Sequence, residues 1–366
     1  MDENKKYIGE LEECNNENSA LKINSGVHQP TTINPNFTKF KKTKLSTQEY
    51  VAGIKNGNIN ILSRAITLIE STLTEDNLQA QEIIEKCLPD SGKSIRIGIT
   101  GVPGVGKSTF IESLGVQIVD EGKKLAVLAI DPSSEKNKGS ILGDKTRMEK
   151  LAIHPRAYIR PSPSSGTLGG IARKTREIII LCETAGFDVI FIETVGVGQS
   201  ETAVHSMVDF FLLLMLSGAG DELQGIKRGI IEMSDAIVIT KSDDNETKSN
   251  IAKLQYQNAL HLFPATESRW IPKVLTCSAI KNKGIKEIWE LINKYKSLVI
   301  QNGFFEANRK RQAIFWLYET INTKIKEDFY NNQTIKNNIN NIENQILEGK
   351  ISSFQAAKIL MDSKDK

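Results

Sequence analysis

The sequence of 366 residues has few of the residues that build disulfide frameworks or zinc sites. It holds four histidines and four cysteines, Cys14, Cys87, Cys182 and Cys277. The cysteines lie far apart, and no pair of Cys or His residues has the spacing of zinc ligands. We therefore expect free, reduced thiols in a cytosolic protein.

Long apolar runs and a strong charge of one sign are also missing. The most apolar run, Phe210–Leu216, is too short to cross a bilayer, and the N-terminal segment has no apolar core like that of a signal peptide. The net charge of +3, from 47 basic and 44 acidic residues, is far from the concentrated basic field of a dedicated nucleic-acid binder. These absences favour a cytoplasmic protein with neither nucleic acid nor membrane as a partner.

What the sequence does contain divides into four segments. Residues 1–45 are rich in Asn, Lys, Glu and Thr with few clustered apolar residues, which predicts a mostly disordered extension. In 46–92 apolar residues recur at helical spacing, which predicts an N-terminal helical subdomain. We expect a single nucleotide-binding domain over 93–300 and a C-terminal helical dimerisation arm over 301–366.

Six short apolar runs alternate with helix-length segments between Ser94 and Ser278. The runs are IRIGIT, LAVLAID, DVIFIET, FFLLLML, AIVIT and KVLTCS. Such runs are typical of strands that are buried on both faces of a parallel sheet covered by helices. The sequence therefore predicts a doubly wound α/β fold with a mainly parallel sheet and helical extensions at both ends.

A glycine-rich segment follows the first run directly. It matches G-x-x-x-x-G-K-[ST], the P-loop pattern, between a strand and an amphipathic helix. In a P-loop the glycines let backbone N–H groups face the phosphates, the lysine reaches the β- and γ-phosphate oxygens, and the hydroxyl after it binds Mg²⁺. The predicted phosphate-binding residues are Gly101, Gly104, Val105, Gly106, Lys107, Ser108 and Thr109.

Three carboxylates are candidates for the metal site. Asp131 and Glu193 end two of the apolar runs, and Asp144 lies in the loop 139–145. Mg²⁺ prefers oxygen ligands, and the carboxyl ends of strands face the ligand crevice of an open α/β sheet. We therefore expect Asp131 and Glu193 to converge on the P-loop, where the Ser108 hydroxyl binds the metal. Each of the three carboxylates could instead cap a helix or lie in a solvated loop.

The segment after Glu193 is a candidate nucleotide-sensing switch. It contains two glycines, so the Gly196 N–H could lie against the γ-phosphate. Gln199 could orient the attacking water, as a glutamine does in some GTPases, or be an ordinary surface residue. We expect Lys107, Glu193 and Gln199 to be catalytic in a direct attack of water on the γ-phosphate, with no covalent intermediate.

The base-recognising motif follows the run AIVIT. Thr240-Lys241-Ser242-Asp243 is close to the N-K-x-D element of GTPases, whose aspartate accepts hydrogen bonds from guanine N1 and N2. Adenine offers no matching donors, so Asp243 favours GTP over ATP, although Thr240 in place of asparagine removes one amide contact. The four residues could also be an ordinary strand-to-loop exit. Ser278 and Ala279 resemble the S-A-x element, and with Lys241 and Asp243 they complete the predicted base site.

Beyond Gly284 the chain is again expected to be helical. Ile335, Ile339, Ile342 and Ile346 recur at spacings of four and three, a pattern typical of a helix-pairing stripe. The stripe could pack on its own domain or join two copies of the chain.

The order of the motifs resembles that of the methylmalonyl-CoA mutase-associated GTPases, the MeaB/ArgK family. The matching strings are the P-loop, IDPSS, GDKTRM, ETVGVGQSE, SGAGDELQGIKRGIIEMSD, TKSDD and CSA. The resemblance covers residues 46–300 densely and the C-terminal helices loosely. It implies a P-loop G-protein chaperone of an adenosylcobalamin-dependent acyl-CoA mutase. Such a chaperone gates cofactor loading and protects the mutase, and the mutase stimulates its slow hydrolysis of GTP to GDP.

The resemblance also implies roles for particular segments. The family's Mg²⁺ and switch carboxylates match Asp131, Asp144 and Glu193, with Ser108 as the hydroxyl ligand. Ser217–Gly229 resembles the family's additional switch loop, although its residues alone would also suit a plain surface connection. Family members are typically homodimers joined through the C-terminal helices. Two rival hypotheses stay open on the same fold: an ATP-using kinase or transport ATPase, and a scaffold that binds nucleotide without hydrolysing it.

Overall fold

The computed structural model describes residues 45–130, 148–161, 168–194, 201–217 and 228–363. In these ranges seven parallel strands form one sheet in the order β3-β2-β4-β1-β5-β6-β7. The strands are β1 Ile95–Gly101, β2 Leu125–Ile130, β3 Ala157–Arg160, β4 Val189–Thr194, β5 Phe210–Leu216, β6 Ala236–Thr240 and β7 Lys273–Thr276. The predicted doubly wound α/β fold is confirmed, and each of the six apolar runs contains a strand.

Strand β3 has no counterpart among the predicted runs. It has only four residues, and two of them make polar contacts with helix α2, which spans Ile59–Glu70. The Tyr158 hydroxyl lies 3.1 Å from the Ser63 hydroxyl, and Arg160 forms an ion pair with Glu70. The strand is thus an edge strand anchored by side chains rather than by an apolar run.

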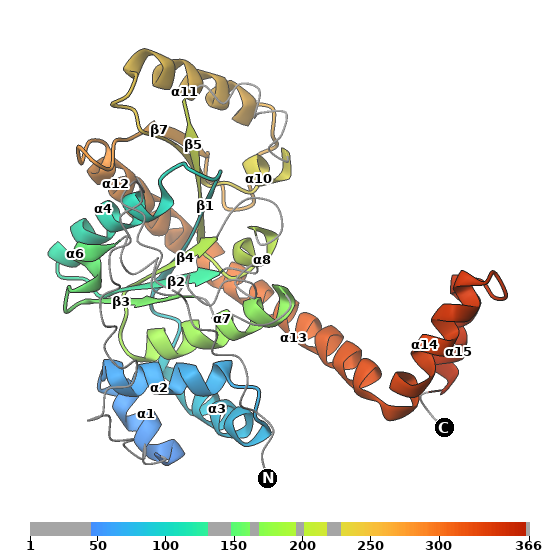
Figure 1. Cartoon of the computed structure of the whole chain (residues 1–366). Helices are drawn as coiled ribbons and strands as arrows, with labels where there is room; N and C mark the ends of the chain where they lie inside the picture. The colour runs from blue at the N-terminus through green and yellow to red at the C-terminus, as the bar shows by residue number, and fades with distance from the viewer. Residues whose placement is uncertain (1–44, 131–147, 162–167, 195–200, 218–227, 364–366) are drawn as a thin grey trace, which may run out of the picture. The chain divides into compact units, whose positions relative to one another are not determined.

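Helices surround the sheet (Figure 1). Helix α4 packs on β1 and β2, α7 packs on β2, and α11 packs on β6 and β7. The helices that follow the first strand are α4 Lys107–Asp120, α6 Glu149–Ala152, α7 Leu168–Thr184, α8 Glu201–His205, α10 Arg228–Glu232, α11 Glu246–Leu260 and α12 Ile285–Gln301.

Three N-terminal helices form a further layer on the outer side of α7 (Figure 1). They are α1 Thr47–Lys55, α2 and α3 Thr74–Cys87, and the short 3₁₀ helix η1 Leu88–Asp90 follows them. Helix α1 begins with a capping box, in which the Ser46 hydroxyl accepts the Glu49 N–H and the Glu49 carboxylate accepts the Ser46 N–H. The apolar face of α2, including Leu62 and Ile66, is fully buried. Local caps and an amphipathic pattern therefore explain this layer.

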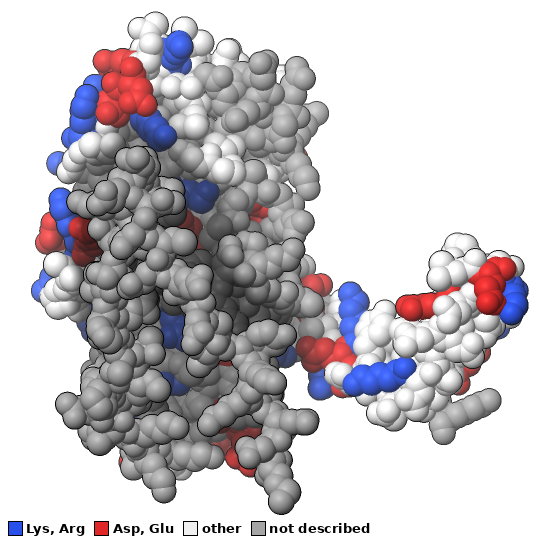
Figure 2. All heavy atoms as spheres, viewed as in Figure 1, with Lys and Arg blue, Asp and Glu red and all other residues white. Residues whose placement is uncertain are grey.

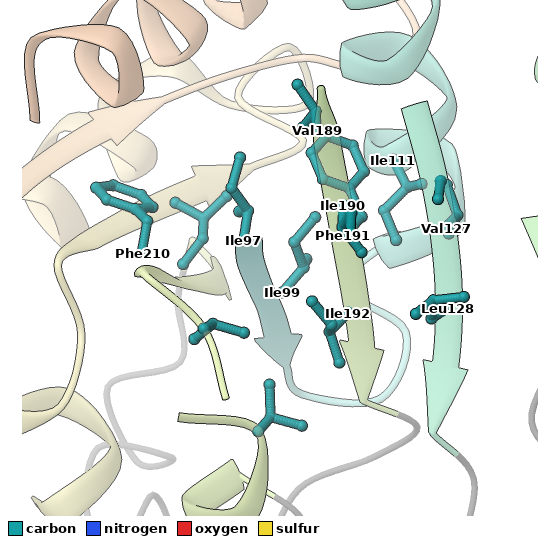
Figure 3. Close-up of a cluster of buried hydrophobic side chains, with 14 of the residues drawn as sticks. Ile97, Ile99, Ile111, Val127, Leu128, Val189, Ile190, Phe191, Ile192 and Phe210 are labelled. Atoms are coloured by element: carbon teal, nitrogen blue, oxygen red, sulfur yellow. The ribbon is translucent and has the colours of Figure 1, made fainter. Parts of the chain in front are cut away.

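The core lies on both faces of the central strands. Figure 3 shows Ile97 and Ile99 of β1 between Phe210 of β5 and the β4 side chains, with Phe191 among them. These four side chains are inaccessible to solvent. Burying each large apolar side chain stabilises the fold by roughly 1.5–3 kcal/mol, so these contacts contribute strongly to holding the central strands together.

Three aspartates make the same kind of hydrogen bond at the amino edge of the sheet. An aspartate precedes each of β4, β5 and β6, and its carboxylate accepts a backbone N–H at the start of the neighbouring strand. The bonds are 2.8 Å each and join Asp188 to Lys124, Asp209 to Arg96, and Asp235 to Phe211. The opposite, carboxyl edge of the sheet holds the nucleotide motifs.

The C-terminal helices are α13 Phe304–Asn331, α14 Gln333–Leu347 and α15 Ser353–Ser363. The isoleucine stripe of α14 packs within the chain, with Ile335 and Ile342 buried and Ile339 and Ile346 partly covered. Ile339, Ile342 and Ile346 line a cavity of about 520 Å³ together with side chains of α13 and α15. The stripe therefore joins three helices of the same chain.

Charge and hydropathy of the described surface agree with the composition. Among the described residues visible in Figure 2, lysines and arginines are interspersed with aspartates and glutamates. Within the described ranges, no helix is both long and apolar enough to span a membrane. Among the described cysteines, Cys87, Cys182 and Cys277 are free and buried.

Candidate functional site

The predicted P-loop connects β1 to α4. Strand β1 ends at Gly101, and α4 begins at Lys107 with Gly106 as its N-cap. Gly104 and Gly106 have φ values of 77° and 86°, which side chains with a Cβ rarely adopt. A Cβ built on Gly104 would meet no atom within 4 Å, so the space beside this glycine is open. This geometry is suited to a loop whose N–H groups and helix terminus face an anion.

Lys107 is half-buried in the first turn of α4. Its Nζ donates a hydrogen bond to the Gly101 carbonyl at 2.9 Å and lies 3.5 Å from the Val102 carbonyl. Burial lowers the pKa of Lys107, while the negative charges of Glu193 and Glu201 act in the opposite direction. The ammonium thus lies along the P-loop backbone, close to where a phosphate would sit.

Glu193 and the two threonines beside it mark the carboxyl ends of β1 and β4. Glu193 pairs in register with Ile99 of β1 and is 7% exposed. The buried Thr194 hydroxyl donates to the Thr100 hydroxyl at 2.8 Å, which joins the two strand ends directly below the P-loop. The sequence motifs did not single out this threonine pair, because neither residue belongs to a phosphate-binding pattern.

The predicted metal shell is only partly described. Ser108 is half-buried in the first turn of α4, near the end of β1, and offers a hydroxyl oxygen; Glu193 offers a carboxylate. Both are oxygen donors of the kind that Mg²⁺ prefers. Asp131, Asp144, Gly196 and Gln199 lie outside the described residues. Within the described ranges, no group of three or more His, Cys, Asp or Glu side chains is placed to hold a metal.

Glu201 is a site residue to which the sequence motifs gave no role. It begins α8, is 3% exposed, and its charge acts on the Lys107 ammonium. Helix α8 packs on β1 and β4, which explains how a residue far along the chain reaches the P-loop. The available signal was its position at the end of ETVGVGQSE, two residues beyond Gln199.

The two base-recognising motifs meet at the carboxyl ends of β6 and β7. Two hydrogen bonds lower the pKa of the Asp243 carboxyl. The larger effect comes from the Ser278 hydroxyl, and the smaller from the backbone N–H of Asp243 itself. The exposed Lys281 ammonium, 3.8 Å away, adds a smaller effect in the same direction. Ser278 itself is fixed by backbone hydrogen bonds with Lys283. Asp243 is therefore an ionised acceptor at neutral pH, which matches two N–H donors on one edge of a base.

The P-loop and the Asp243 loop are directly connected. The Thr240 hydroxyl donates to the Val105 carbonyl at 2.8 Å, and Thr240 is only 3% exposed. Lys241 has φ of 54°, and its Cε lies 4.0 Å from where a Cβ on Gly106 would be. The expectation that threonine merely loses an amide contact is thus incomplete, because its hydroxyl makes a bond to the P-loop.

The predicted phosphate and base residues come from segments far apart in the sequence. The P-loop residues Gly101–Thr109, Lys241, Asp243, Ser278 and Ala279 all lie at the carboxyl ends of β1, β6 and β7 or in the turns that follow them. These three strands belong to the same half of the sheet, with β5 between β1 and β6. The structure therefore places the predicted phosphate and base residues along one edge of the sheet.

Known proteins resemble the chain over most of its length. The family model of the methylmalonyl Co-A mutase-associated GTPase MeaB matches residues 62–334. A probable GTPase of Mycobacterium tuberculosis is 46% identical over 310 residues, 84% of this chain and 92% of that protein. GTPase ArgK of Escherichia coli is 45% identical over 286 residues, 78% of this chain and 86% of that protein.

A mammalian relative and a solved structure extend this comparison. The mouse protein named methylmalonic aciduria type A homolog, mitochondrial, is 44% identical over 320 residues, 84% of this chain and 77% of that protein. The crystal structure of a protein named LAO/AO transport system kinase superposes with a TM-score of 0.70 at 34% identity. It covers 87% of this chain and 98% of that one. With the P-loop, the parallel sheet and relatives named as GTPases in agreement, this chain belongs to the MeaB family of GTPases.

Proposed function

We propose that the chain is a GTP-dependent chaperone of an adenosylcobalamin-dependent acyl-CoA mutase of the methylmalonyl-CoA mutase type. The observation that carries the nucleotide assignment is the meeting of the two base motifs with the P-loop. The Ser242 N–H donates to the Cys277 carbonyl at 3.0 Å, and the Thr240 hydroxyl donates to the Val105 carbonyl at 2.8 Å. The mutase assignment is supported by the family description and by the name of the mouse relative. In this proposal the nucleotide state gates cofactor loading and protects the mutase, and the mutase stimulates hydrolysis.

The proposed chemistry is direct attack of water on the γ-phosphate. Lys107 and the P-loop N–H groups stabilise the negative charge that develops on the phosphate oxygens. Ser108 and Glu193, with Asp131 and Asp144, would hold Mg²⁺, which would supply further positive charge to the phosphates. We assign Gln199 to orienting the water.

A rival function is suggested by the structural relative whose name is a transport system kinase. Asp243 distinguishes a GTPase from an ATP-using kinase. An ionised aspartate can accept hydrogen bonds from the N1 and N2 donors of guanine, whereas the corresponding edge of adenine carries no such donors. Replacing Asp243 with alanine is expected to reduce the preference for GTP over ATP by about ten- to a hundredfold, since a hydrogen bond to a charged group contributes about 1.5–3 kcal/mol. Dissociation constants for both nucleotides, measured by isothermal titration calorimetry, provide the test.

The exposed neighbour Asp244 is the matched control for this experiment. Asp244→Ala removes the same charge from the same turn and is expected to keep the wild-type preference. An unchanged preference in Asp243→Ala would remove the guanine assignment and leave the kinase hypothesis in place.

The partner is tested with the full chain and a purified mutase from the same host. Co-purification of the two proteins is expected to depend on whether GTP or GDP is present, and the mutase is expected to accelerate GTP hydrolysis. A host without any adenosylcobalamin-dependent mutase, or a mutase that neither binds nor accelerates hydrolysis, would contradict the chaperone proposal.

We also propose that the chain is a cytoplasmic homodimer joined through its C-terminal helices. Helix α13 exposes an apolar row at helical spacing, which its own chain leaves uncovered. The row consists of Ile314, Leu317, Tyr318, Ile321 and Ile325. Sedimentation velocity is expected to give twice the mass of one chain, and a monomer at micromolar concentration would contradict the proposal. The free, buried thiols of the described cysteines support a reducing compartment.

A further inference from the structure

We infer that Gln312 and Trp316 of α13 are positioning residues for GTP hydrolysis, because they hold α8, the helix that carries Glu201, against the nucleotide site. The structure describes α13 over its whole length, and Gln312 and Trp316 are its two buried residues. They lie one helical turn apart and are 6% and 7% exposed. The contacts of α13 with the sheet domain beyond its first turns therefore depend on these two side chains.

Both buried side chains donate hydrogen bonds to the backbone that follows α8. The Gln312 amide donates to the Val208 carbonyl at 2.7 Å. The Trp316 indole N–H donates to the Ser206 carbonyl at 3.2 Å, and Ser206 directly follows His205, the last residue of α8. An amphipathic helix usually buries an apolar stripe, whereas both buried positions here carry N–H donors. The pair therefore fixes where the C-terminal end of α8 lies.

Helix α7 lies against α13 and supports the same two side chains (Figure 1). The Arg176 guanidinium donates to the Gln312 carbonyl at 2.9 Å and lies 5.6 Å from the centre of the Trp316 ring, a cation–π distance. The Gln312 side-chain oxygen is buried and has no hydrogen-bond partner among the described residues. A buried acceptor without a partner is unfavourable. The amide is thus held in place by its bond to Val208, although its own oxygen stays unpaired.

Helix α8 packs closely on one side and loosely on the other. On the inner side, a Cβ built on Gly98 of β1 would come within 2.9 Å of the Val204 side chain, so α8 rests directly on the strand. On the side toward α13 there is a cavity of about 270 Å³, whose walls include Thr202 of α8 and Trp316. Atoms that line a cavity lose dispersion contacts. The two hydrogen bonds from α13 therefore restrain α8 on the side where packing does not.

The opposite end of α8 lies near the phosphate site. Glu201 is its first residue, is 3% exposed, and acts through its charge on the Lys107 ammonium. A triphosphate at the P-loop brings negative charge beside Lys107 and so repels Glu201. Because α8 has only five residues, a displacement at one end reaches the other. Nucleotide binding should therefore alter the surroundings of Trp316, and loss of the α13 contacts should misplace Glu201 during hydrolysis.

The kinetic test removes each donor separately from the full chain. Trp316→Phe lacks the indole N–H but keeps an aromatic ring, and Gln312→Met lacks the amide at similar volume. The single-turnover rate of GTP hydrolysis is expected to fall about three- to tenfold in each variant, as the loss of one hydrogen bond predicts. KM for GTP is expected to stay within about twofold of wild type, because the P-loop and the base loop bind the ground state.

Trp289 provides the matched control. It is a buried tryptophan of α12, 3% exposed, whose indole N–H donates to the Glu121 carboxylate at 2.8 Å. Trp289→Phe removes the same N–H from another helix and is expected to keep the wild-type rate of hydrolysis.

Tryptophan fluorescence gives a readout that a purely structural role would not change. The full chain is titrated with GDP and with the imido analogue of GTP, whose bridge between the β- and γ-phosphates is not hydrolysed. Emission is expected to change on binding, and to change more with the analogue, because the γ-phosphate adds negative charge. Most of this change is expected to be lost in Trp316→Phe, reduced in Gln312→Met and retained in Trp289→Phe. Calorimetry under the same conditions establishes that each variant is saturated with nucleotide.

Three results would overturn the positioning role. Hydrolysis rates of Trp316→Phe and Gln312→Met that match that of Trp289→Phe would show that α13 does not position α8 for the reaction. A raised KM with an unchanged rate would place the effect on nucleotide binding instead. An undiminished emission change in Trp316→Phe would show that α8 does not transmit nucleotide binding to α13. Gln312→Met decides the question even if Trp316→Phe fails to fold. Every measurement uses the chain and nucleotide without a mutase, so its outcome is independent of the chaperone proposal.

Discussion

Replacing Lys107 with alanine is expected to reduce the rate of GTP hydrolysis by at least about a hundredfold, the magnitude typical of losing one preorganised charge-stabilising donor. The Lys107 ammonium already lies along the P-loop, 2.9 Å from the Gly101 carbonyl, so it needs little rearrangement to reach a phosphate oxygen. Its half-buried position strengthens its interaction with a developing negative charge. Nucleotide affinity should fall as well, since the ammonium also contacts the bound ground state.

Phosphate release under single-turnover conditions measures this effect, because it separates the chemical step from product dissociation. Lys86→Ala is a suitable control: this exposed lysine lies in the last turn of α3, in the N-terminal helical layer. Lys107→Arg retains the charge with a different geometry and distinguishes charge from placement. A Lys107→Ala protein with near wild-type turnover would show that hydrolysis takes place at another site.

The contiguous motifs explain how much of the fold was predictable. Six strands could be identified because each lies in an apolar run, and all of them except the edge strand β7 are buried on both faces. The P-loop could be identified because its glycines, lysine and serine are adjacent in the sequence. Strand β3 was missed because Tyr158 and Arg160 stabilise it through Ser63 and Glu70, residues of a distant helix. Contacts of this kind depend on the tertiary structure and have no local pattern.

The candidate site was likewise predictable only where residues form contiguous motifs. Asp243 and Ser278 were each predicted as base-site residues, but the hydrogen bond between them depends on β6 and β7 being neighbours in the sheet. The Thr240 bond to Val105 was not predicted, because a motif comparison shows only that asparagine is replaced. The electrostatic effect of Glu201 on Lys107 depends on the packing of α8 against β1. The sequence therefore predicted which residues the chemistry of the site requires, but not which residues they contact in the folded protein.

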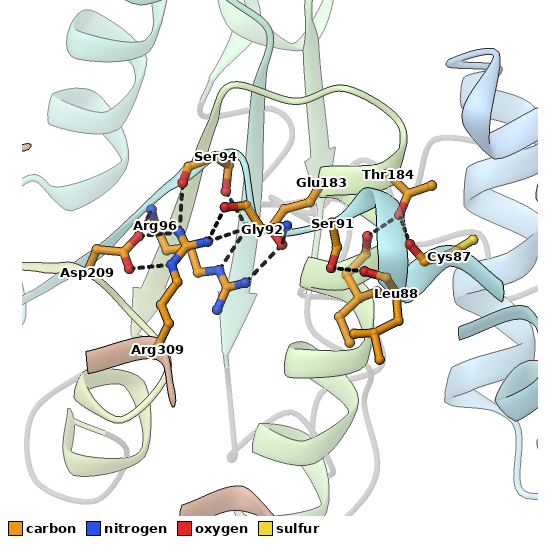
Figure 4. Close-up of polar contacts among 11 residues, drawn as sticks. Cys87, Leu88, Ser91, Gly92, Ser94, Arg96, Glu183, Thr184, Asp209 and Arg309 are labelled. Atoms are coloured by element: carbon orange, nitrogen blue, oxygen red, sulfur yellow. Dashed lines mark hydrogen bonds and ion pairs between the residues drawn. The ribbon is translucent and has the colours of Figure 1, made fainter. Parts of the chain in front are cut away.

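A buried ionic network at the amino edge of the sheet lies outside every sequence motif (Figure 4). Its centre is Glu183 of α7, whose side chain is completely enclosed. The Glu183 carboxylate accepts hydrogen bonds from the Arg96 guanidinium at 2.9 Å, from the Ser94 hydroxyl at 2.6 Å and from the Gly92 N–H at 2.7 Å. Arg309 of α13 lies 3.5 Å from the same carboxylate and also forms an ion pair with Asp209 at 2.7 Å. The network therefore joins α7, β1 and α13.

Replacing Glu183 with alanine is expected to lower the free energy of unfolding by about 3–5 kcal/mol, because removing one partner leaves buried charges uncompensated. Arg96 would keep no carboxylate partner among those described for it, whereas Arg309 would keep Asp209. Urea denaturation followed by circular dichroism measures the change. Glu85→Ala, at an exposed position of α3, is the matched control and should stay within about 0.5 kcal/mol of wild type.

The pH dependence of stability tests whether the charge of Glu183, rather than its shape, is responsible. The arginines Arg96 and Arg309, with the Ser94 hydroxyl, lower the pKa of the Glu183 carboxyl against the opposing effect of burial. A carboxyl whose pKa is lower in the folded state contributes its full stability above the unfolded value of about 4.5 and loses it as the pH falls toward the folded value. The difference between wild type and Glu183→Gln should therefore be constant from pH 7 to about pH 5 and narrow below that. A difference that persists unchanged at acidic pH, where wild type still folds, would assign the stabilisation to packing and hydrogen bonding instead of to the ion pairs.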